Sequence, residues 1–531
     1  MQIKSMRLGT DTGKKRATLP ELFLAKKLNA LQISAMVLVL AGIFFLVYSP
    51  HFSSPFPLHI DEWYSIQQAM EISNGAFSFG SISNFQLGFD LFLFAIGKAI
   101  NLILAYQFFP AIWAVISAAV LFFVAYNLTE RNFLVSLLSM IFFGSVKSNN
   151  NITGLWFFTP LTFAIPFIFL YMFFFAKGLK EEKRKYLLIS LGIMLFLVFV
   201  HALSVLFAVP ILVLACLFNI KFVRKECLTF LLFLLVPAAG ILFYSAFMKI
   251  GVWHGISEIV TLLQFSKYWA GPFVTVVNNS FTEIYSIMGY ALAFSGALYI
   301  IAKKRKDFAL YLVWPVYLLA AIGYYYLTGM SYLSPYIRNF YFFALGLPLL
   351  SALGMNYLFE IISSGIKRIS VEGAGKKTMN FIKSGILAVI FSALVFLSYV
   401  NYYSPPASGV HSYIVSINSQ DYQDLSYLLR FPPGNLVVPP NLMAAAYPVA
   451  GKNPVGYLFE SQNPSIVADL IELSGTGNCT IRDSILSKYN ISYYMTENPV
   501  NCNYTVLLSN NQNTIYYVGS SGIKNQSLTS K

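Results

Sequence analysis

The sequence has few charged residues. Only 11% of its 531 residues are Asp, Glu, Lys or Arg, whereas soluble domains carry about a quarter. At the same time, 57% of the residues are hydrophobic. A chain of this composition cannot give a large soluble domain its usual polar surface, so most of it is expected to face lipid.

The sequence also lacks several motifs of soluble enzymes. It has no metal-ligand spacing, no glycine-rich phosphate loop and no nucleophile elbow. No small-residue cleavage site follows the first apolar run, which argues against a removed signal peptide. We therefore expect the polar, basic segment 1–29 to stay in the cytoplasm and the first apolar run to act as an anchor.

What the sequence does contain is a series of long apolar runs. Hydrocarbon about 30 Å thick needs roughly 20 apolar residues per helical crossing, and such runs recur between 30 and 403. They end where a polar tail, 404–531, begins. The predicted fold class is a polytopic α-helical membrane protein with a small C-terminal extracytoplasmic α/β domain.

The positive charge lies between the apolar runs. The net charge of +14 comes from 36 Lys and Arg against 22 Asp and Glu, a balance that can indicate nucleic-acid binding. Short basic segments between spans are instead typical of cytoplasmic loops. We therefore predict a cytoplasmic N-terminus and no nucleic-acid partner. The basic clusters are 177–185, 221–225, 303–306 and 367–383.

The number of crossings follows from the side on which each basic cluster lies. The chain must cross an even number of times between its basic start and residue 177, yet five apolar segments occur there. The weakest is 87–105, which contains Asp90, Lys98 and Asn101, and a charge at mid-bilayer costs about 2.5–3.5 kcal/mol. We predict that this segment re-enters the outer face without crossing, which leaves about eleven spans and a tail outside the cytoplasm.

Three predicted outer loops, 49–107, 248–286 and the short but polar 328–339, are longer than a connection needs, and long loops are often functional. In the first, Asp61 and Glu62 open an amphipathic helix that would direct a carboxylate at a cleft. Asp61 could equally be the N-cap of this helix. Neighbouring helical residues project about 100° apart, so the two acids are not a facing acid/base pair, and one carboxylate is expected to act.

Few cations are predicted on the outer side. Arg338 directly precedes a span, where its guanidinium could hold a phosphate through two parallel hydrogen bonds or could extend to the interface among tyrosines. His201 could bond a phosphate or be structural. Lys147 is a further candidate cation, and Glu258 is a further candidate carboxylate.

Four cysteines occur in the chain. Cys479 and Cys502 share the predicted outer domain and could form a disulfide, or they could be two unpaired small side chains. Cys216 and Cys227 lie near the predicted cytoplasmic face and are expected to be free thiols.

Three features together resemble the polytopic glycosyltransferases of the GT-C fold, which use polyprenyl-phosphate-linked sugars. The first is the acidic motif HIDEW after span one, followed by ISNGAFSFGS and FQLGFDLFLFAIGKAI. The second is the long outer loop after span seven, and the third is the arginine in YIRNFYFFALGLPLL. The resemblance covers residues 30–403.

The resemblance implies an activity and roles for the candidate residues. A hexosyl or pentosyl group would pass from a polyprenyl-phosphate donor to a glycan, lipid or protein acceptor at the outer face, with inversion. Asp61, with Glu62 beside it, would supply the catalytic base, or a metal ligand in metal-dependent members. Arg338 would bind the donor phosphate, with His201 and Lys147 as further candidates.

The chain departs from this family at two places. The next outer loop reads VKSNNNITG, with Lys147 and no acid, so a divalent metal is disfavoured and no cofactor is certain. The WWD signature of oligosaccharyltransferases is absent, which favours transfer of a single sugar or short glycan. A transporter or lipid flippase is the alternative function, and an inactive surface-assembly protein is a third.

The sequence of the tail, 404–531, predicts helices that alternate with strands. This order favours a layered α/β fold. We expect this domain to bind an acceptor or to cap the site. The predicted helices are DYQDLSYLLR, IVADLIEL and IRDSILSKY, and the predicted strands are NLVVPP, ISYYMT, TVLLS and TIYYVG.

Overall fold

The computed structural model describes most of the chain. One predicted candidate, Glu258, lies outside the described residues. The described residues are 28–74, 86–148, 154–233, 280–368, 376–400, 416–456 and 464–519, with the short pieces 235, 251, 253, 257, 264–266 and 402.

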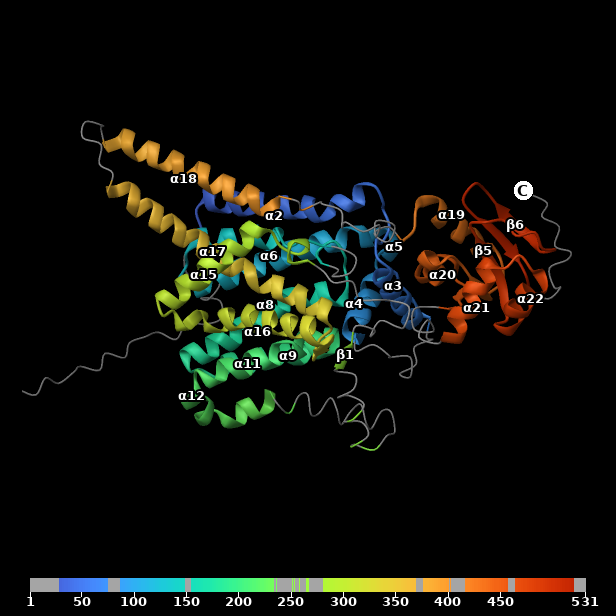
Figure 1. Cartoon of the computed structure of the whole chain (residues 1–531), viewed down its shortest axis with the longest axis horizontal. Coiled ribbons are helices and arrows are strands. Elements are labelled where there is room, and N and C mark those ends of the chain that lie inside the picture. The colour runs from blue at the N-terminus through green and yellow to red at the C-terminus, as the bar shows by residue number, and fades with distance from the viewer. Residues whose placement is uncertain are drawn as a thin grey trace, which may run out of the picture.

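A bundle of apolar helices forms the body of the protein, with the C-terminal domain at one end (Figure 1). Within the described residues, six helical stretches are long and apolar enough to cross a membrane, and further apolar helices are shorter. This confirms a multi-pass membrane protein, while the count of about eleven spans stays a prediction. The bundle comprises α2 (Ala30–Tyr48), α6 (Phe109–Leu128), α7 (Phe133–Gly144), α8 (Pro160–Glu181), α9 (Arg184–His201), α10 (Leu203–Leu206), α11 (Ala208–Leu217), α12 (Ile220–Lys225), α15 (Ile287–Ala302), α16 (Ala309–Thr328), α17 (Tyr336–Arg368) and α18 (Lys376–Tyr399).

Basic turns gather at the end of the bundle away from the C-terminal domain. The turn after α8 meets the 3-10 helix η5 (Lys306–Phe308), since Lys180 Nζ lies 3.4 Å from Asp307 Oδ2. Helix α12, the last turns of α17 and the first turns of α18 also lie at this end (Figure 1). The basic turns and the C-terminal domain therefore lie at opposite ends of the bundle. Which end faces the cytoplasm stays a prediction.

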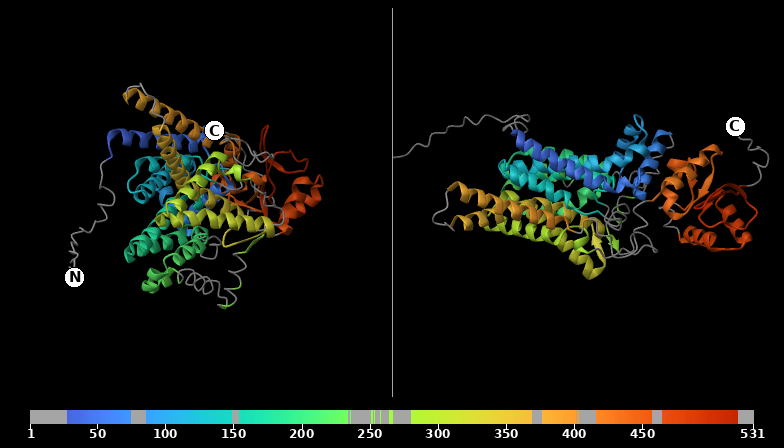
Figure 2. Two further views of the ribbon diagram at one scale, coloured as in Figure 1. Left: turned by 60° about the vertical axis from the view of Figure 1, so that its left-hand side comes forward. Right: turned by 90° about the horizontal axis from the view of Figure 1, so that it is seen from above.

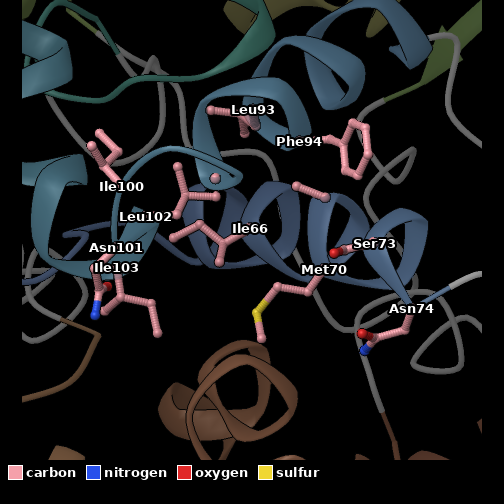
Figure 3. A pocket seen from close by; sticks show the side chains of 12 residues that line it. Ile66, Met70, Ser73, Asn74, Leu93, Phe94, Ile100, Asn101, Leu102 and Ile103 are labelled. Atoms are coloured by element: carbon pink, nitrogen blue, oxygen red, sulfur yellow. The ribbon is translucent and has the colours of Figure 1, made fainter.

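Short helices cover the end of the bundle next to the C-terminal domain. Helix α3 (Ile60–Ser73) packs against α4 (Leu87–Gly97) and α5 (Leu102–Ala105), as Figure 3 shows. Strand β1 (Gln264–Ser266) pairs antiparallel with β2 (Met330–Tyr332), directly before α17. Three 3-10 helices complete this region: η1 (Ser49–Phe52), η3 (Tyr106–Phe108) and η4 (Phe281–Glu283).

The C-terminal domain is a mixed five-stranded sheet with helices, in the strand order β4-β3-β5-β7-β6. The predicted helices and strands all form, within a few residues of the expected bounds, and Cys479 and Cys502 form a disulfide. Helix α20 and strand β4 were not predicted. The elements are α19 (Ser419–Tyr427), η7 (Leu428–Arg430), β3 (Asn435–Val437), η8 (Pro440–Leu442), α20 (Met443–Ala450), β4 (Asn453–Pro454), α21 (Pro464–Gly475), α22 (Cys479–Lys488), β5 (Ile491–Thr496), β6 (Thr505–Ser509) and β7 (Thr514–Tyr517).

The C-terminal domain packs on the segment that leads into α3 (Figure 2). The Ser416 N–H donates to the Leu58 carbonyl at 3.1 Å, and the rings of Phe56 and Tyr422 stack with centroids 4.6 Å apart. The domain therefore contacts the same loop that carries Asp61.

Candidate active site

Helix α3 begins with reciprocal hydrogen bonds that fix its first turn. His59 is the N-cap, and its Nδ1 accepts from the Asp61 N–H at 3.2 Å. Glu62 Oε2 accepts from the N–H groups of Leu58 and His59 at 2.8 and 2.9 Å. This capping box satisfies donors that a helix start otherwise leaves unpaired. The N-cap alternative for Asp61 is therefore wrong, because His59 holds that position.

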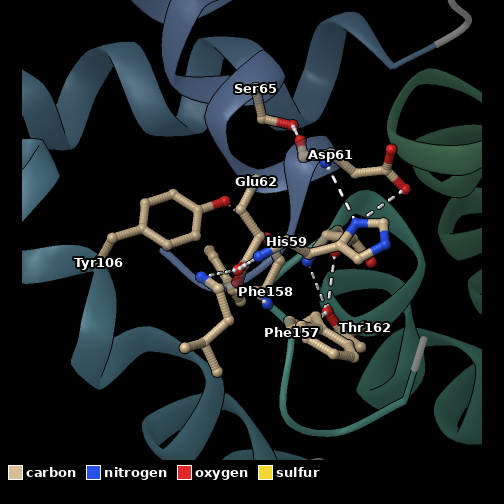
Figure 4. A network of polar contacts seen from close by, with 10 residues as sticks. His59, Asp61, Glu62, Ser65, Tyr106, Phe157, Phe158 and Thr162 are labelled. Atoms are coloured by element: carbon tan, nitrogen blue, oxygen red, sulfur yellow. Dashed lines mark hydrogen bonds and ion pairs between the residues drawn. The ribbon is translucent and has the colours of Figure 1, made fainter. Parts of the chain in front are cut away.

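Glu62 is fully buried and accepts hydrogen bonds from three backbone N–H groups in two segments of the chain. In addition to its two bonds at the start of α3, its Oε1 accepts from the Phe158 N–H at 2.6 Å. Phe158 is itself held by Tyr106, whose hydroxyl donates to the Phe158 carbonyl at 2.5 Å (Figure 4). Burial raises the pKa of Glu62 to about 8, and the three N–H donors act in the opposite direction. Glu62 thus positions α3 and has little access to a substrate.

Asp61 has a different environment, although it is the next residue. Its side chain is 42% exposed, and its Oδ2 lies 3.5 Å from His59 Nδ1. In Figure 4 the Asp61 carboxylate extends beside the His59 ring, while Glu62 lies on the Tyr106 side. Asp61 is therefore the accessible carboxylate of the pair, held on a turn whose geometry Glu62 fixes.

Arg338 lies in the first turn of α17, just after β2. The turn before it is fixed by Asn339, whose side-chain amide donates to Ser331 Oγ at 3.0 Å. The Arg338 guanidinium is near enough to Asp61 for their charges to interact, and it also interacts with His201. Residues from three separate parts of the sequence therefore meet at the end of the bundle that carries the C-terminal domain.

His201 ends α9, where the chain turns into α10 and α11 and runs back. The ring is buried, and its Nδ1 lies 2.7 Å from Ser204 Oγ. One nitrogen of this ring is therefore engaged by the turn itself, and the charge of Arg338 acts on the same buried ring. The structural alternative for His201 is therefore present, and its interaction with the charge of Arg338 was not predicted.

Lys147 lies at the end of α7 and is engaged elsewhere. Its Nζ donates to the Thr282 carbonyl at 2.7 Å, and its N–H donates to the Ile284 carbonyl at 2.9 Å. Burial lowers the pKa of Lys147, and the Glu283 carboxylate opposes this effect. Lys147 therefore ties α7 to η4, and no contact in the described chain places it beside Asp61.

Comparison with solved structures places this arrangement in a known architecture. The apo oligosaccharyltransferase of Archaeoglobus fulgidus matches 88% of this chain over 69% of its own, with a TM-score of 0.57 and 12% identity. The same enzyme with an inhibitory peptide and dolichol-phosphate matches equal shares, with a TM-score of 0.53 and 12% identity. The chain has the GT-C fold. No family model and no curated protein sequence matches it.

The GT-C fold in this chain offers an incomplete set of metal ligands. Within the described residues, no group of three or more His, Cys, Asp and Glu lies close enough to hold a metal ion. Asp61 has His59 beside it, whereas a hard divalent cation takes about six oxygen ligands. These residues alone do not fit a metal site, so we derive no step through a metal.

Two contributors to this site were not predicted from the sequence. His59 matters because its ring supports Asp61, and the spacing from His59 to Glu62 is that of a capping box, a signal present in HIDEW. Phe158 matters because its backbone holds Glu62. Sequence offers no signal for that contact, since the two residues are remote in the chain.

Proposed function

We propose that this protein is a membrane glycosyltransferase that moves a sugar from a polyprenyl-phosphate donor to an acceptor at the outer membrane face. The observation that carries the proposal is a half-exposed carboxylate, Asp61, within range of the charge of a guanidinium, Arg338, on the GT-C fold. The solved neighbour that contains dolichol-phosphate supports a lipid-phosphate donor.

The chemistry requires a base and a stabilised leaving group. Asp61 takes the proton of the acceptor while the acceptor atom forms a bond to the anomeric carbon of the sugar. The bond from that carbon to the phosphate oxygen breaks, and the phosphate keeps the electron pair. Arg338 stabilises the charge that develops on the phosphate. A single displacement of this kind inverts the anomeric centre.

The half-exposed position of Asp61 suits a base better than burial would. A carboxylate that must accept a proton from an incoming acceptor needs a path to that acceptor, and the buried Glu62 has none in this conformation. The capping box fixes the backbone of Asp61 in the first turn of α3, which places its carboxylate before the acceptor binds. The transferred group is the one that the sequence favoured, a single sugar or short glycan, and the acceptor is a lipid, protein or glycan.

The purified protein in proteoliposomes tests this function. Polyprenyl-phosphate sugars are supplied with a panel of lipid, glycan and peptide acceptors, and products are followed by mass spectrometry. We expect a glycosylated acceptor and a free polyprenyl phosphate in equal amounts. Movement of the donor between leaflets without any glycosylated product would instead support a flippase and contradict the proposal.

A further inference from the structure

A groove of about 350 Å³ lies between α3 and the α4–α5 segment, apart from the site described above. Its floor is apolar, and its rim is polar (Figure 3). Sites for small ligands commonly have about this volume, within a range of about 300–1,000 Å³. The floor includes Ile66, Ala69, Met70, Leu93, Leu102 and Ile103, and the rim includes Ser73, Asn74 and Asn101.

The groove continues into a surface that suits lipid. On the α4–α5 segment and the adjoining η3, four large apolar side chains are 42–46% exposed. One of them, Ile100, also lines the groove. A helix surface of this kind favours hydrocarbon over water, and through Ile100 it adjoins the apolar floor of the groove. The four residues are Leu91, Ile100, Leu104 and Phe108.

Lys98 is not one of the residues that line the groove, but its ammonium reaches Ser73 and Phe94, which do. Lys98 is exposed, its Nζ donates to Ser73 Oγ at 3.0 Å, and it lies 5.1 Å from the centroid of the Phe94 ring. A lysine whose stem covers apolar surface and whose ammonium reaches the water interface is placed to attract an anionic head group.

We propose that this groove binds a bilayer lipid with an anionic head group, with its hydrocarbon chain between α3 and α4–α5 and its phosphate at Lys98. Three observations support it: the apolar floor, the continuity with the lipid-facing surface, and the position of the charge. The bound chain would fill space between α3 and its neighbour. A bilayer lipid would thus become part of the support of the helix that carries Asp61 and Glu62.

Gly97 offers a way to fill the groove without disturbing its walls. A Cβ at this glycine would lie 3.7 Å from Leu102 Cδ2, which is ordinary van der Waals contact. Gly192, on the exposed side of α9, would meet nothing within 4 Å. Gly97→Phe therefore tests the groove, and Gly192→Phe is the matched change on a helix surface elsewhere.

The first test uses nanodiscs that contain phosphatidylglycerol with a photoreactive group in its acyl chain. After irradiation, labelled peptides are mapped by mass spectrometry. We expect label on Met70 of α3 as well as on the exposed face at Leu104, which serves as an internal reference. Gly97→Phe should reduce the Met70 label at least five-fold relative to Leu104, while Gly192→Phe leaves the ratio unchanged.

The second test concerns the head group and does not depend on filling the groove. The Met70 label is compared between phosphatidylglycerol and phosphatidylcholine probes at equal density. The wild-type protein should favour the anionic lipid several-fold, Lys98→Arg should keep that preference, and Lys98→Gln should abolish it. Lys488→Gln, in the C-terminal domain, is the control and should keep it.

Two results would overturn the proposal. The absence of lipid label on α3 would mean that a segment of the chain or another protein covers the groove. Equal label from both lipids in the wild-type protein would mean that Lys98 recognises no anionic head group. Both readouts are independent of sugar transfer, so they stand or fall separately from the proposed function.

Discussion

Two adjacent carboxylates occupy opposite environments in this protein. Asp61 is half-exposed beside His59, whereas Glu62 is buried and accepts three backbone hydrogen bonds. The sequence could predict that an acidic helix start matters and that the two side chains diverge. It could not predict which acid would be buried, because that depends on Phe158, almost a hundred residues further along the chain.

Glu62→Gln should weaken the attachment of α3. A glutamine has one acceptor oxygen in place of two, so either the Phe158 N–H or the N–H groups at the start of α3 would face an amide NH₂. An unsatisfied buried donor costs about 1–3 kcal/mol. We expect a lower thermal midpoint and faster hydrogen exchange at residues 58–62 and 158. Glu71→Gln, on the same helix, is the control, and an unchanged midpoint for Glu62→Gln would contradict the assigned role.

The stability of the wild-type protein should depend on pH through the same residue. The pKa of Glu62 is raised to about 8 in the folded state from 4.5. A raised carboxyl pKa means that folding favours the neutral form, so its contribution is complete below about pH 4.5 and is lost as the pH rises through about 8. We expect the thermal midpoint to fall between about pH 4.5 and 8 and to level off above that, and Glu62→Gln to show a smaller fall. An identical pH dependence in both proteins would exclude Glu62 as its source.

Replacement of Arg338 tests whether its side chain binds the donor phosphate. Arg338→Gln removes charge-assisted hydrogen bonds worth about 1.5–3 kcal/mol, so kcat/KM for the donor should fall by roughly 10- to 150-fold. Arg338→Lys keeps the charge and loses the planar fork, so it should recover only part of the activity. Equal activity in the glutamine variant and the wild type would remove Arg338 from the site.

At the scale of elements, apolar pattern and turn signals were sufficient for most of the fold. Strands β5 and β6 begin and end where the sequence predicts. Helix α20 was not predicted because MAAAYPVA is short, follows prolines and contains Pro448, which disfavours a helix interior. Packing against α3 stabilises it, and sequence patterns do not reveal such a tertiary contact.

It should be possible to remove the contact between the C-terminal domain and the loop before α3 without unfolding the domain. Tyr422→Ala removes the ring that stacks on Phe56, a contact worth about 0.5–1.5 kcal/mol beyond the area it buries. We expect faster hydrogen exchange at residues 56–62. Tyr427→Ala, which removes a ring contact with Phe431 inside the domain, should leave that segment unchanged. The same exchange in both variants would contradict a specific contact.

At the scale of the whole molecule, the basic turns and the C-terminal domain lie at opposite ends of the helix bundle (Figure 1). The sequence predicts this separation from charge alone, because the positive-inside rule depends on the loops and needs no knowledge of packing. What it could not supply is the convergence of Asp61, Arg338 and His201, which depends on how the helices pack.

Thiol labelling in sealed cells or vesicles tests the membrane orientation. Cys227 is an exposed free cysteine beside α12, so it should react with a membrane-impermeant reagent only when the cytoplasmic face is accessible. Cys479 and Cys502 should react from the outside, and only after reduction of their disulfide. Labelling of Cys227 from the outside would reverse the predicted topology.

The measurement that tests the central claim most directly is sugar transfer by Asp61→Asn. The variant keeps the size and shape of the side chain and loses the base, so transfer should fall by about 100- to 10,000-fold, with an unchanged thermal midpoint. Glu71→Gln, which neutralises a carboxylate about three turns further along α3, should retain activity. Wild-type transfer by a folded Asp61→Asn protein would contradict the assignment of this carboxylate as the catalytic base.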